Sequence, residues 1–390
     1  MDDRAVTTRP DLLEAARALA PTLVARAAEV EAARRVPEDL SLRVAEAGFY
    51  RAFVPASVGG DEQDPAAANA AVEELARHDA SVAWVSFIAM TSGSALSDIP
   101  EAAAKAIFAT PTTTIAGVFA PQGRADRVEG GYRVSGRWSW GSGSDNADWL
   151  LGGCRFFDGD APERGRGGAP RANMVLLPRR DVAVLGDWDA SGLCGTGSGS
   201  FETRETFVPE AHVLGLGLGP PQQGALYRFP RFGLLALGIA AVALGSARAA
   251  IDDLVALARE KTPTGSSRTL AHRTATQGEV ARAEAGLRAA RLFFYDAIER
   301  CHERAVRHGD APLALRREMR LAAAHAVEEA VRVVDAMYAL GGGSAVHRSH
   351  PLQRRFRDVH VATQHMMVAP PVFELIGRTY LDVEADTRQL

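Results

Sequence analysis

The stretch "GYRVSGRWSWGSGSDNADWL", from Gly131 to Leu150, holds three of the five tryptophans of the chain among glycines, serines and aspartates. Its first half alternates apolar and polar residues, which is the pattern of a half-buried β-strand. The preceding "VEGG" places Gly130 and Gly131 between two alternating runs and indicates a hairpin. The tryptophan-rich half has three interpretations: a solvent-facing turn, a packing motif of a sheet, or the wall of a ligand site.

Short alternating runs continue on both sides of this stretch, from about Thr112 to Val213, and are separated by Gly, Pro and Asp turns. This pattern is typical of an antiparallel sheet. "GLGLGPPQQG", from Gly215 to Gly224, is then a linker or surface loop. We therefore expect a central antiparallel β domain over residues 116–222.

Helical patterns occupy both flanks of the β region. From Asp11 to about Arg35, apolar residues recur three and four apart, which predicts an amphipathic helix broken or bent near Pro21. More helices follow up to residue 115, and three long periodic segments with a shorter one after Pro351 lie beyond residue 223. Long antiparallel helices joined by short loops make a bundle. The predicted architecture is an N-terminal helical domain (1–115), the β domain (116–222) and a C-terminal four-helix bundle (223–390).

The composition excludes some classes of function. The 390 residues carry a net charge of -4 with a pI near 6.2, without the basic stripe that a nucleic-acid binder needs. The longest apolar run, Leu234–Ala247, is too short for a membrane span and indicates a buried helix. No signal-peptide pattern, disulfide framework or metal-ligand spacing is present, since Cys154, Cys194 and Cys301 lie far apart. We expect a cytoplasmic protein without a metal site, with no nucleic-acid or membrane partner.

The order of helices, sheet and bundle, taken with two motifs, resembles the acyl-CoA dehydrogenase fold over almost the whole chain. One motif is the opening stretch. The other is "GGGSAVHRSHPLQRRFRDVH", from Gly341 to His360, which is similar to the Gly-Gly to Arg-Asp segment of that family. Many dehydrogenases carry a glutamate base eight residues after that aspartate, where this chain has Met366, and a methionine cannot act as a base. Some dehydrogenases place the base on another helix, so an acyl-CoA dehydrogenase-type flavoenzyme stays an alternative.

The chain resembles a second branch of this fold more closely, the two-component flavin-dependent monooxygenases. In several of these, a histidine follows the Arg-Asp pair by seven residues, and "RDVHVATQH" puts His365 at that spacing; "ADW" and "GLCGTGS" also match. The resemblance implies the oxygenase component, which takes reduced FMN or FAD from a separate flavin reductase. With O2 and through a C4a-(hydro)peroxyflavin, it would hydroxylate a small aromatic or polycyclic molecule or oxidise an amine nitrogen. Members of the fold are usually tetramers, which implies a homotetramer.

The same resemblance implies two catalytic residues. His365 would accept a proton from the substrate or donate a hydrogen bond to bound oxygen, the alternative being a histidine that is merely hydrogen-bonded in the core. Ser142 would contact flavin N5, because Gly141 stands where the family has a hydroxyl residue; otherwise backbone N–H groups at Gly141 would act. His360 is interpreted as structural, and the pair Arg357 and Asp358 as an ion pair or helix-terminal contact.

The implied cofactor site combines an apolar wall with polar loops. Two tryptophans of the opening stretch would exclude water, unless they only pack the hairpin. The loop "GLCGTGSGS" would offer hydroxyls, and the glycines after residue 341 would approach the flavin of a neighbouring subunit, unless they only end a helix. The expected contacts are Trp138, Trp140, Gly141, Ser142, Gly143, Thr196, Gly197, Ser198, Gly342 and Gly343. Lys261 or Arg268 would serve the phosphate.

A third alternative is a non-catalytic ligand-binding or scaffold protein of the same fold. It is suggested by Gly141, by Asn146 where related hydroxylases have histidine, and by a missing early histidine. The helical segment that would carry that histidine offers only Ser86, Thr91, Ser92 and Ser94.

Overall fold

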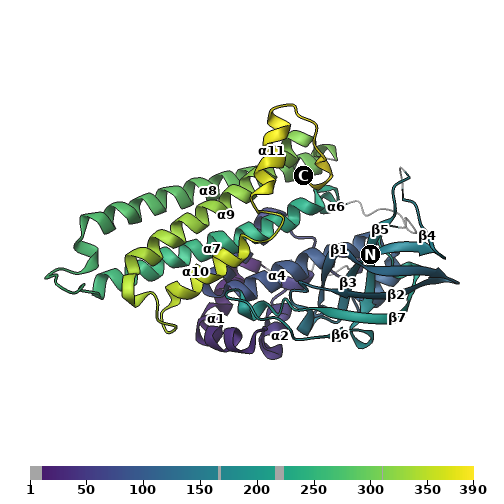
Figure 1. Ribbon diagram of the computed structural model, residues 1–390, viewed down its shortest axis with the longest axis horizontal. Helices are drawn as coiled ribbons and strands as arrows, with labels where there is room; N and C mark the ends of the chain where they lie inside the picture. Colours follow the sequence, from purple (N-terminus) through teal and green to yellow (C-terminus); the bar gives the residue numbers. More distant parts are fainter. Residues whose placement is uncertain (1–10, 166–167, 216–223, 310) are drawn as a thin grey trace, which may run out of the picture.

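The computed structural model describes residues 11–165, 168–215, 224–309 and 311–390. The protein is elongated, with a β domain at one end and long helices that run away from it (Figure 1). The chain order of helical domain, sheet and bundle matches the prediction. The expected linker lies almost wholly outside the described residues, which leave out 216–223.

The N-terminal domain is helical, and its first helix begins where Asp11 accepts hydrogen bonds from the N–H groups of Leu13 and Glu14. Of the two predicted outcomes at Pro21, a break or a bend, the break is wrong, because the helix runs through the proline without interruption. Its apolar face continues past the proline with Leu23, and burial of that face outweighs the one backbone hydrogen bond that proline removes. Its α-helices, from residue 11 onward, are α1 (Leu12–Ala33), α2 (Glu38–Glu46), α3 (Pro65–His78), α4 (Ala80–Gly93) and α5 (Glu101–Ile107).

In the part of the chain that the structure describes, seven strands form one sheet in the order β4-β3-β1-β2-β7-β6, with β5 paired to β3. The predicted hairpin joins β1 and β2, where Val128 pairs with Gly131 and Gly130 has a φ of +74°. The strands are β1 (Ile115–Val128), β2 (Gly131–Trp138), β3 (Trp149–Asp158), β4 (Ala161–Pro162), β5 (Ala172–Pro178), β6 (Ala183–Val184) and β7 (Phe201–Pro209).

The sheet is mixed, which corrects the expectation of a purely antiparallel domain. β3 lies parallel to β1, with Ile115 opposite Trp149, while the other strand pairs are antiparallel. The chain leaves β2 at Trp138 and enters β3 on the other side of β1 after only ten residues, 139–148. This crossover contains the glycine-serine turn of the opening stretch.

Helix α4 connects the sheet to the bundle. It contacts both β1 and α7, and nearly every residue in it is buried. A helix that is apolar on all sides is expected between two layers. Two helical stretches in the described chain, Ala80–Asp98 and Arg231–Glu260, are long and apolar enough to cross a membrane, but 89% and 94% of their most apolar windows are buried in the protein. We interpret both as core helices.

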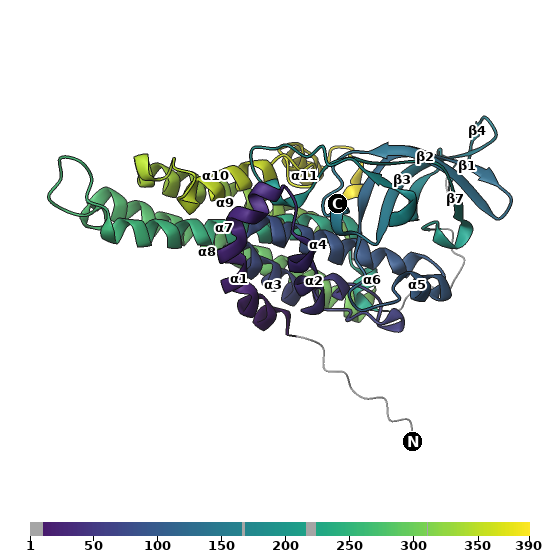
Figure 2. The ribbon, with the colours of Figure 1, turned by 90° about the horizontal axis from the view of Figure 1, so that it is seen from below.

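The C-terminal bundle is present as predicted. Its long helices lie side by side, and the connections after α7 and after α9 are at the end far from the sheet (Figures 1 and 2). The helices are α6 (Ala225–Arg228), α7 (Arg231–Glu260), α8 (Thr274–His308), α9 (Leu313–Gly341), α10 (Pro351–Ala362) and α11 (Pro371–Tyr380).

Candidate active site

The crossover after β2 is bonded to the loop before β7. The N–H of Gly141 donates to the carbonyl of Gly199 at 2.9 Å, and the N–H of Gly143 donates to the carbonyl of Thr196 at 2.9 Å. A Cβ at Gly141 would lie 2.8 Å from the ring of Phe201, so the close approach requires glycine. The glycine-serine turn and the loop "GLCGTGSGS", two separate motifs that were predicted to share a site, are thus neighbours. The N–H of Gly141 is already bonded to the carbonyl of Gly199, which argues against the alternative in which this N–H, rather than Ser142, would serve the flavin.

A chain of hydrogen-bonded hydroxyls runs through these two segments. Nε1 of Trp84, on α4, donates to Oγ of Ser142 at 3.1 Å. Oγ of Ser142 lies 2.6 Å from Oγ of Ser198, which lies 2.7 Å from Oγ1 of Thr196. Thr196 in turn donates to the carbonyl of Leu193 at 2.8 Å. All five residues are buried. Three predicted site residues therefore form one connected structure.

Helix α10 anchors this loop to the bundle. Oδ1 of Asp358 accepts a hydrogen bond from the N–H of Leu193 at 2.6 Å, and Leu193 has a left-handed φ of +48°. Burial raises the pKa of Asp358 to about 6, with a further contribution from the buried carboxyl of Asp79. Arg357 pairs with Glu31 of α1 at 2.7 Å and donates to the carbonyl of Ser191. Both residues hold elements together, which agrees with the structural interpretation of the Arg-Asp pair.

His365 lies just beyond the end of α10, with its ring centroid 5.9 Å from that of Trp84. Its Nδ1 accepts a hydrogen bond from the N–H of Met367 at 3.2 Å, so the neutral ring carries its proton on Nε2. Burial and, to a smaller degree, the positive charge of Arg320 lower the pKa of His365 to about 4. The imidazole is therefore a neutral hydrogen-bond donor at ordinary pH.

His360 has different surroundings. Its Nε2 lies 2.9 Å from Oδ1 of Asp335, and its ring packs on Phe356 at a centroid distance of 4.5 Å. The contact with Asp335 joins α10 to α9, whereas Phe356 lies in α10 itself, and both support the structural interpretation.

The two tryptophans predicted to form a wall lie in different environments. Trp138 is 0% exposed, stacks on Phe201 at 5.2 Å and donates from Nε1 to the carbonyl of Gly153 at 2.7 Å. A ring with no exposed surface cannot line a cofactor site, so this expectation is corrected to packing of the sheet. Trp140 is 70% exposed, has a φ of +72° and contacts Trp188 edge to face at 5.7 Å.

The remaining glycines of the prediction fall into two groups. Gly197 is buried in the loop with a φ of +56°, and a Cβ there would lie 2.3 Å from Oδ2 of Asp145. Gly342 and Gly343 are exposed and directly follow α9, which ends far from the sheet (Figure 1). There Nζ of Lys261 donates to the carbonyl of Gly341 at 2.7 Å. The structure does not bring these two glycines to the hydroxyl chain.

Trp84 is the residue that the sequence reasoning missed. The sequence analysis named hydroxyl residues of the same helix instead. Two of these donate to carbonyls within α4: Ser86 to that of Val82, and Thr91 to that of Phe87. Nor did the sequence separate Trp188 from ordinary loop residues. The only available signal for Trp84 was an indole N–H within an otherwise apolar helix, since such a group usually finds a partner when buried.

Asn146 is also structural, because its Nδ2 donates to the carbonyl of Val36 at 2.8 Å.

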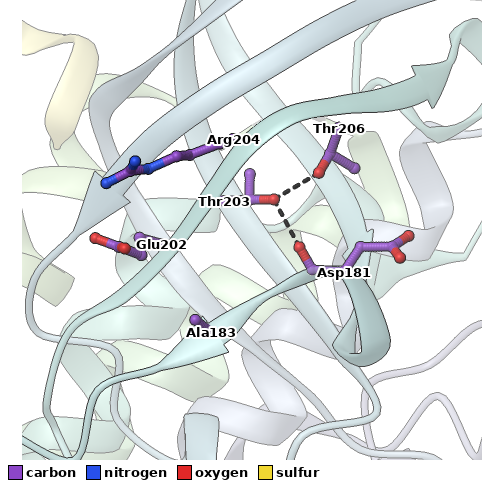
Figure 3. A pocket seen from close by; sticks show the side chains of 6 residues that line it. All are labelled: Asp181, Ala183, Glu202, Thr203, Arg204 and Thr206. Atoms are coloured by element: carbon purple, nitrogen blue, oxygen red, sulfur yellow. Dashed lines mark hydrogen bonds between the residues drawn. The ribbon is translucent and has the colours of Figure 1, made fainter.

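Two cavities lie away from these residues. The first, about 320 Å³, opens at the β6–β7 edge of the sheet, where Thr203 donates to the carbonyl of Asp181 and contacts the hydroxyl of Thr206 (Figure 3). The second, about 260 Å³, lies among α1, α3, α7 and the start of α10. Neither is lined by a predicted site residue. Within the described residues, no group of three or more His, Cys, Asp or Glu side chains is placed to hold a metal ion.

Two domains of the chain match a known protein family. Residues 8–111 match the N-terminal domain of acyl-CoA dehydrogenases and residues 237–370 match their C-terminal domain. The fold and these domains define a flavoprotein of the acyl-CoA dehydrogenase fold.

Individual relatives narrow the class. The chain is 32% identical over 357 residues to an indole-3-acetate monooxygenase of Pseudomonas putida, covering 91% of this chain and 90% of that one. It is 29% identical to the flavin-dependent monooxygenase oxygenase subunit HsaA of Rhodococcus jostii, covering 89% and 92%. The structure of XiaF from Streptomyces sp. in complex with FADH2 and glycerol superposes with a TM-score of 0.87 at 27% identity, covering 96% of each chain. The chain belongs to the flavin-dependent monooxygenases of the acyl-CoA dehydrogenase fold, which confirms the predicted family.

Proposed function

We propose that this chain is the oxygenase component of a two-component system that hydroxylates a small aromatic or polycyclic molecule. The observation that carries the proposal is His365, whose ring packs edge to face on Trp84, the same indole that donates to Ser142 in the hydroxyl chain. Oxidation of an amine nitrogen uses the same arrangement and is the second candidate. The dehydrogenase alternative lacks a carboxylate at its expected place, since Met366 is there and is 63% exposed.

The residues present fit a reduced flavin. Ser142 has a lone pair for a ring N–H, and the loop over Thr196 to Ser198 is held rigidly against it. Reduced FMN or FAD, supplied by a separate reductase, would provide the electrons that activate O2. This chain's own groups orient the ring, exclude water and donate a hydrogen bond from His365. Trp140, which lies in the crossover and is 70% exposed, is the proposed apolar wall.

A homotetramer is the proposed assembly. Gly342 and Gly343 lie at the end of the bundle away from the sheet, next to Lys261, and reach a flavin only if it is held by another copy (Figure 1). Leu292 on α8 is 71% exposed, and such a contact would cover this apolar side chain. The molar mass from light scattering after gel filtration tests the tetramer.

We also propose a cytoplasmic location, which the free Cys154, Cys194 and Cys301 support.

One experiment tests the reaction. The protein is mixed anaerobically with reduced FMN or FAD, O2 is added, and absorbance is followed for a transient species distinct from reduced and oxidised flavin. Direct reoxidation without such a species would contradict an oxygenase. Bleaching of bound FAD by an acyl-CoA would instead establish the dehydrogenase, and a scaffold would show neither.

A second experiment tests His365. Replacement by Asn should leave flavin binding nearly unchanged and reduce the product formed per flavin oxidised. His360→Asn is the matched control, since that ring faces Asp335. An unchanged yield in the His365 variant would remove this residue from the mechanism.

A further inference from the structure

The hydroxyl chain has two ends that cannot exchange roles. Nε1–H of Trp84 can only donate, and the carbonyl of Leu193 can only accept. Between them lie three hydroxyls, each with a single proton. A hydrogen bond can point either way between two hydroxyls, so the direction of the middle links depends on these ends.

The number of protons in the chain determines the direction of the middle hydrogen bonds. The chain has four contacts, from Trp84 to Ser142, Ser198, Thr196 and Leu193, and four protons, one from the indole and three from the hydroxyls. All four contacts are hydrogen bonds only when every proton points from Trp84 toward Leu193. Reversal of one link would leave two lone pairs facing each other at less than 3 Å in a buried region, which is unfavourable.

Ser142 therefore has one role left for a ligand. It accepts from Trp84 and gives its only proton to Ser198, so the side that remains is a lone pair. The backbone offers no competing donor in this turn, because the N–H groups of Gly141, Ser142 and Gly143 donate to the carbonyls of residues 199, 140 and 196. The bond from Leu193 to Asp358 holds the accepting end of the chain in place.

We propose that this chain makes Ser142 a dedicated hydrogen-bond acceptor and thereby gives the site a preference for reduced over oxidised flavin. In reduced flavin N5 carries a proton, whereas in oxidised flavin N5 is itself an acceptor and would face the lone pair of Ser142. Ser198 and Thr196 are positioning residues that act through Ser142. The inference rests on the proposed function for the placement of flavin N5 beside Ser142.

Thr196→Val tests the proposal at its accepting end. Without the Thr196 hydroxyl, the proton of Ser198 has no acceptor there and turns toward Ser142. Ser142 then accepts from both Trp84 and Ser198, and its own proton is free to point at the ligand. Dissociation constants of reduced and oxidised flavin are measured anaerobically. The preference for reduced flavin should fall about tenfold, the size of one hydrogen bond, which corresponds to a bound-flavin potential about 30 mV lower.

Two variants separate this effect from a general disturbance. Thr196→Ser keeps the hydroxyl and should keep the wild-type preference. Trp84→Phe removes a larger group but leaves three protons for three contacts that still end at Leu193, so its preference should stay within about threefold of wild type. A structural disturbance alone would affect Trp84→Phe at least as strongly as Thr196→Val.

Ser198→Ala provides a second break in the chain and should lower the preference as Thr196→Val does. It decides the matter if Thr196→Val fails to fold. An unchanged ratio of the two constants in folded Thr196→Val or Ser198→Ala would overturn the inference, as would equal binding of both flavin forms by the wild type. Failure of the wild type to bind either form would instead contradict the proposed function.

Discussion

Trp138 and Trp140 are two positions apart in one segment, yet their surroundings are opposite. Trp138 is the last residue of β2 and is 0% exposed, whereas Trp140 follows it in the crossover and is 70% exposed. Gly123, Gly136 and Gly152 surround the indole of Trp138, and a Cβ at any of them would lie within 3 Å of it. Trp140 instead has a left-handed backbone and touches Trp188 at its edge.

The difference separates a core side from a site side within the same motif. On the core side, around Trp138, glycines on the neighbouring strands leave the space that the indole fills. The site side, from Trp140 through Ser142, tolerates an exposed aromatic ring and a strained backbone, both of which are unfavourable for stability alone. Outliers of this kind are concentrated at functional sites. We infer that the core side serves the stability of the sheet, whereas the site side serves contact with a ligand.

The largest test of this comparison is Trp138→Ala. Loss of a fully buried indole and its hydrogen bond to Gly153 should lower the free energy of unfolding by about 3–5 kcal/mol. Trp140→Ala is the matched control and should change it by no more than about 0.5 kcal/mol. Chemical denaturation followed by circular dichroism measures both. Similar losses in the two variants would remove the distinction between core side and site side.

Gly152→Ala sharpens the core side. Its Cβ would lie 2.8 Å from Cζ2 of Trp138, so the indole must shift, and we expect a loss of about 1–3 kcal/mol in the free energy of unfolding. Gly343→Ala, at a position with nothing within 4 Å, should be nearly neutral by the same measurement. A neutral Gly152→Ala would show that the indole is not confined by its neighbours.

The sequence predicted the layers of this fold because periodicity is local. Alternation identified β2 and its hairpin, and long apolar stripes identified the bundle. The end of β2 is not local: if the strand continued, residues 138 and 140 would share one face. It ends because Gly141 bonds to the carbonyl of Gly199, a residue 58 positions later. The parallel pairing of β3 with β1 was missed for the same reason.

The candidate site was predicted unevenly. Resemblance supplied Ser142, Thr196, Ser198 and His365, but not their connection. Trp84 was missed because α4 is apolar on every side, so its pattern does not indicate which residue reaches the crossover. The distance of Gly342 from this site is also set by the packing of whole helices rather than by nearby residues.

Asp358, which holds Leu193 at the end of the hydroxyl chain, tests whether burial of its carboxylate lowers the stability of the fold. Its pKa in the folded protein is about 6, above the ordinary value of 3.8, because burial disfavours the charge. The folded state therefore binds a proton first as pH falls, and the contribution of this group to stability rises between pH 7.5 and 5. Relative to Asp358→Asn, whose amide oxygen still accepts from Leu193, the wild type should gain about 1 kcal/mol over that range. A constant difference between the two unfolding free energies would show that Asp358 is not held as a buried carboxylate.

The smallest expected effect concerns His365 and is an absence of change. An ordinary histidine, with a pKa near 6.5, loses half of its neutral form at that pH. The pKa of His365 is about 4, because burial and then Arg320 disfavour the charge, so the ring stays neutral as pH falls to about 5.5. Product formed per flavin oxidised should therefore be constant from pH 8 to 5.5 as far as this residue is concerned. A step in that yield near pH 6.5 that disappears in His365→Asn would show that the ring is hydrated and titrates normally. The surroundings of His365 would then be open to water, in contrast with the dry core around Trp138.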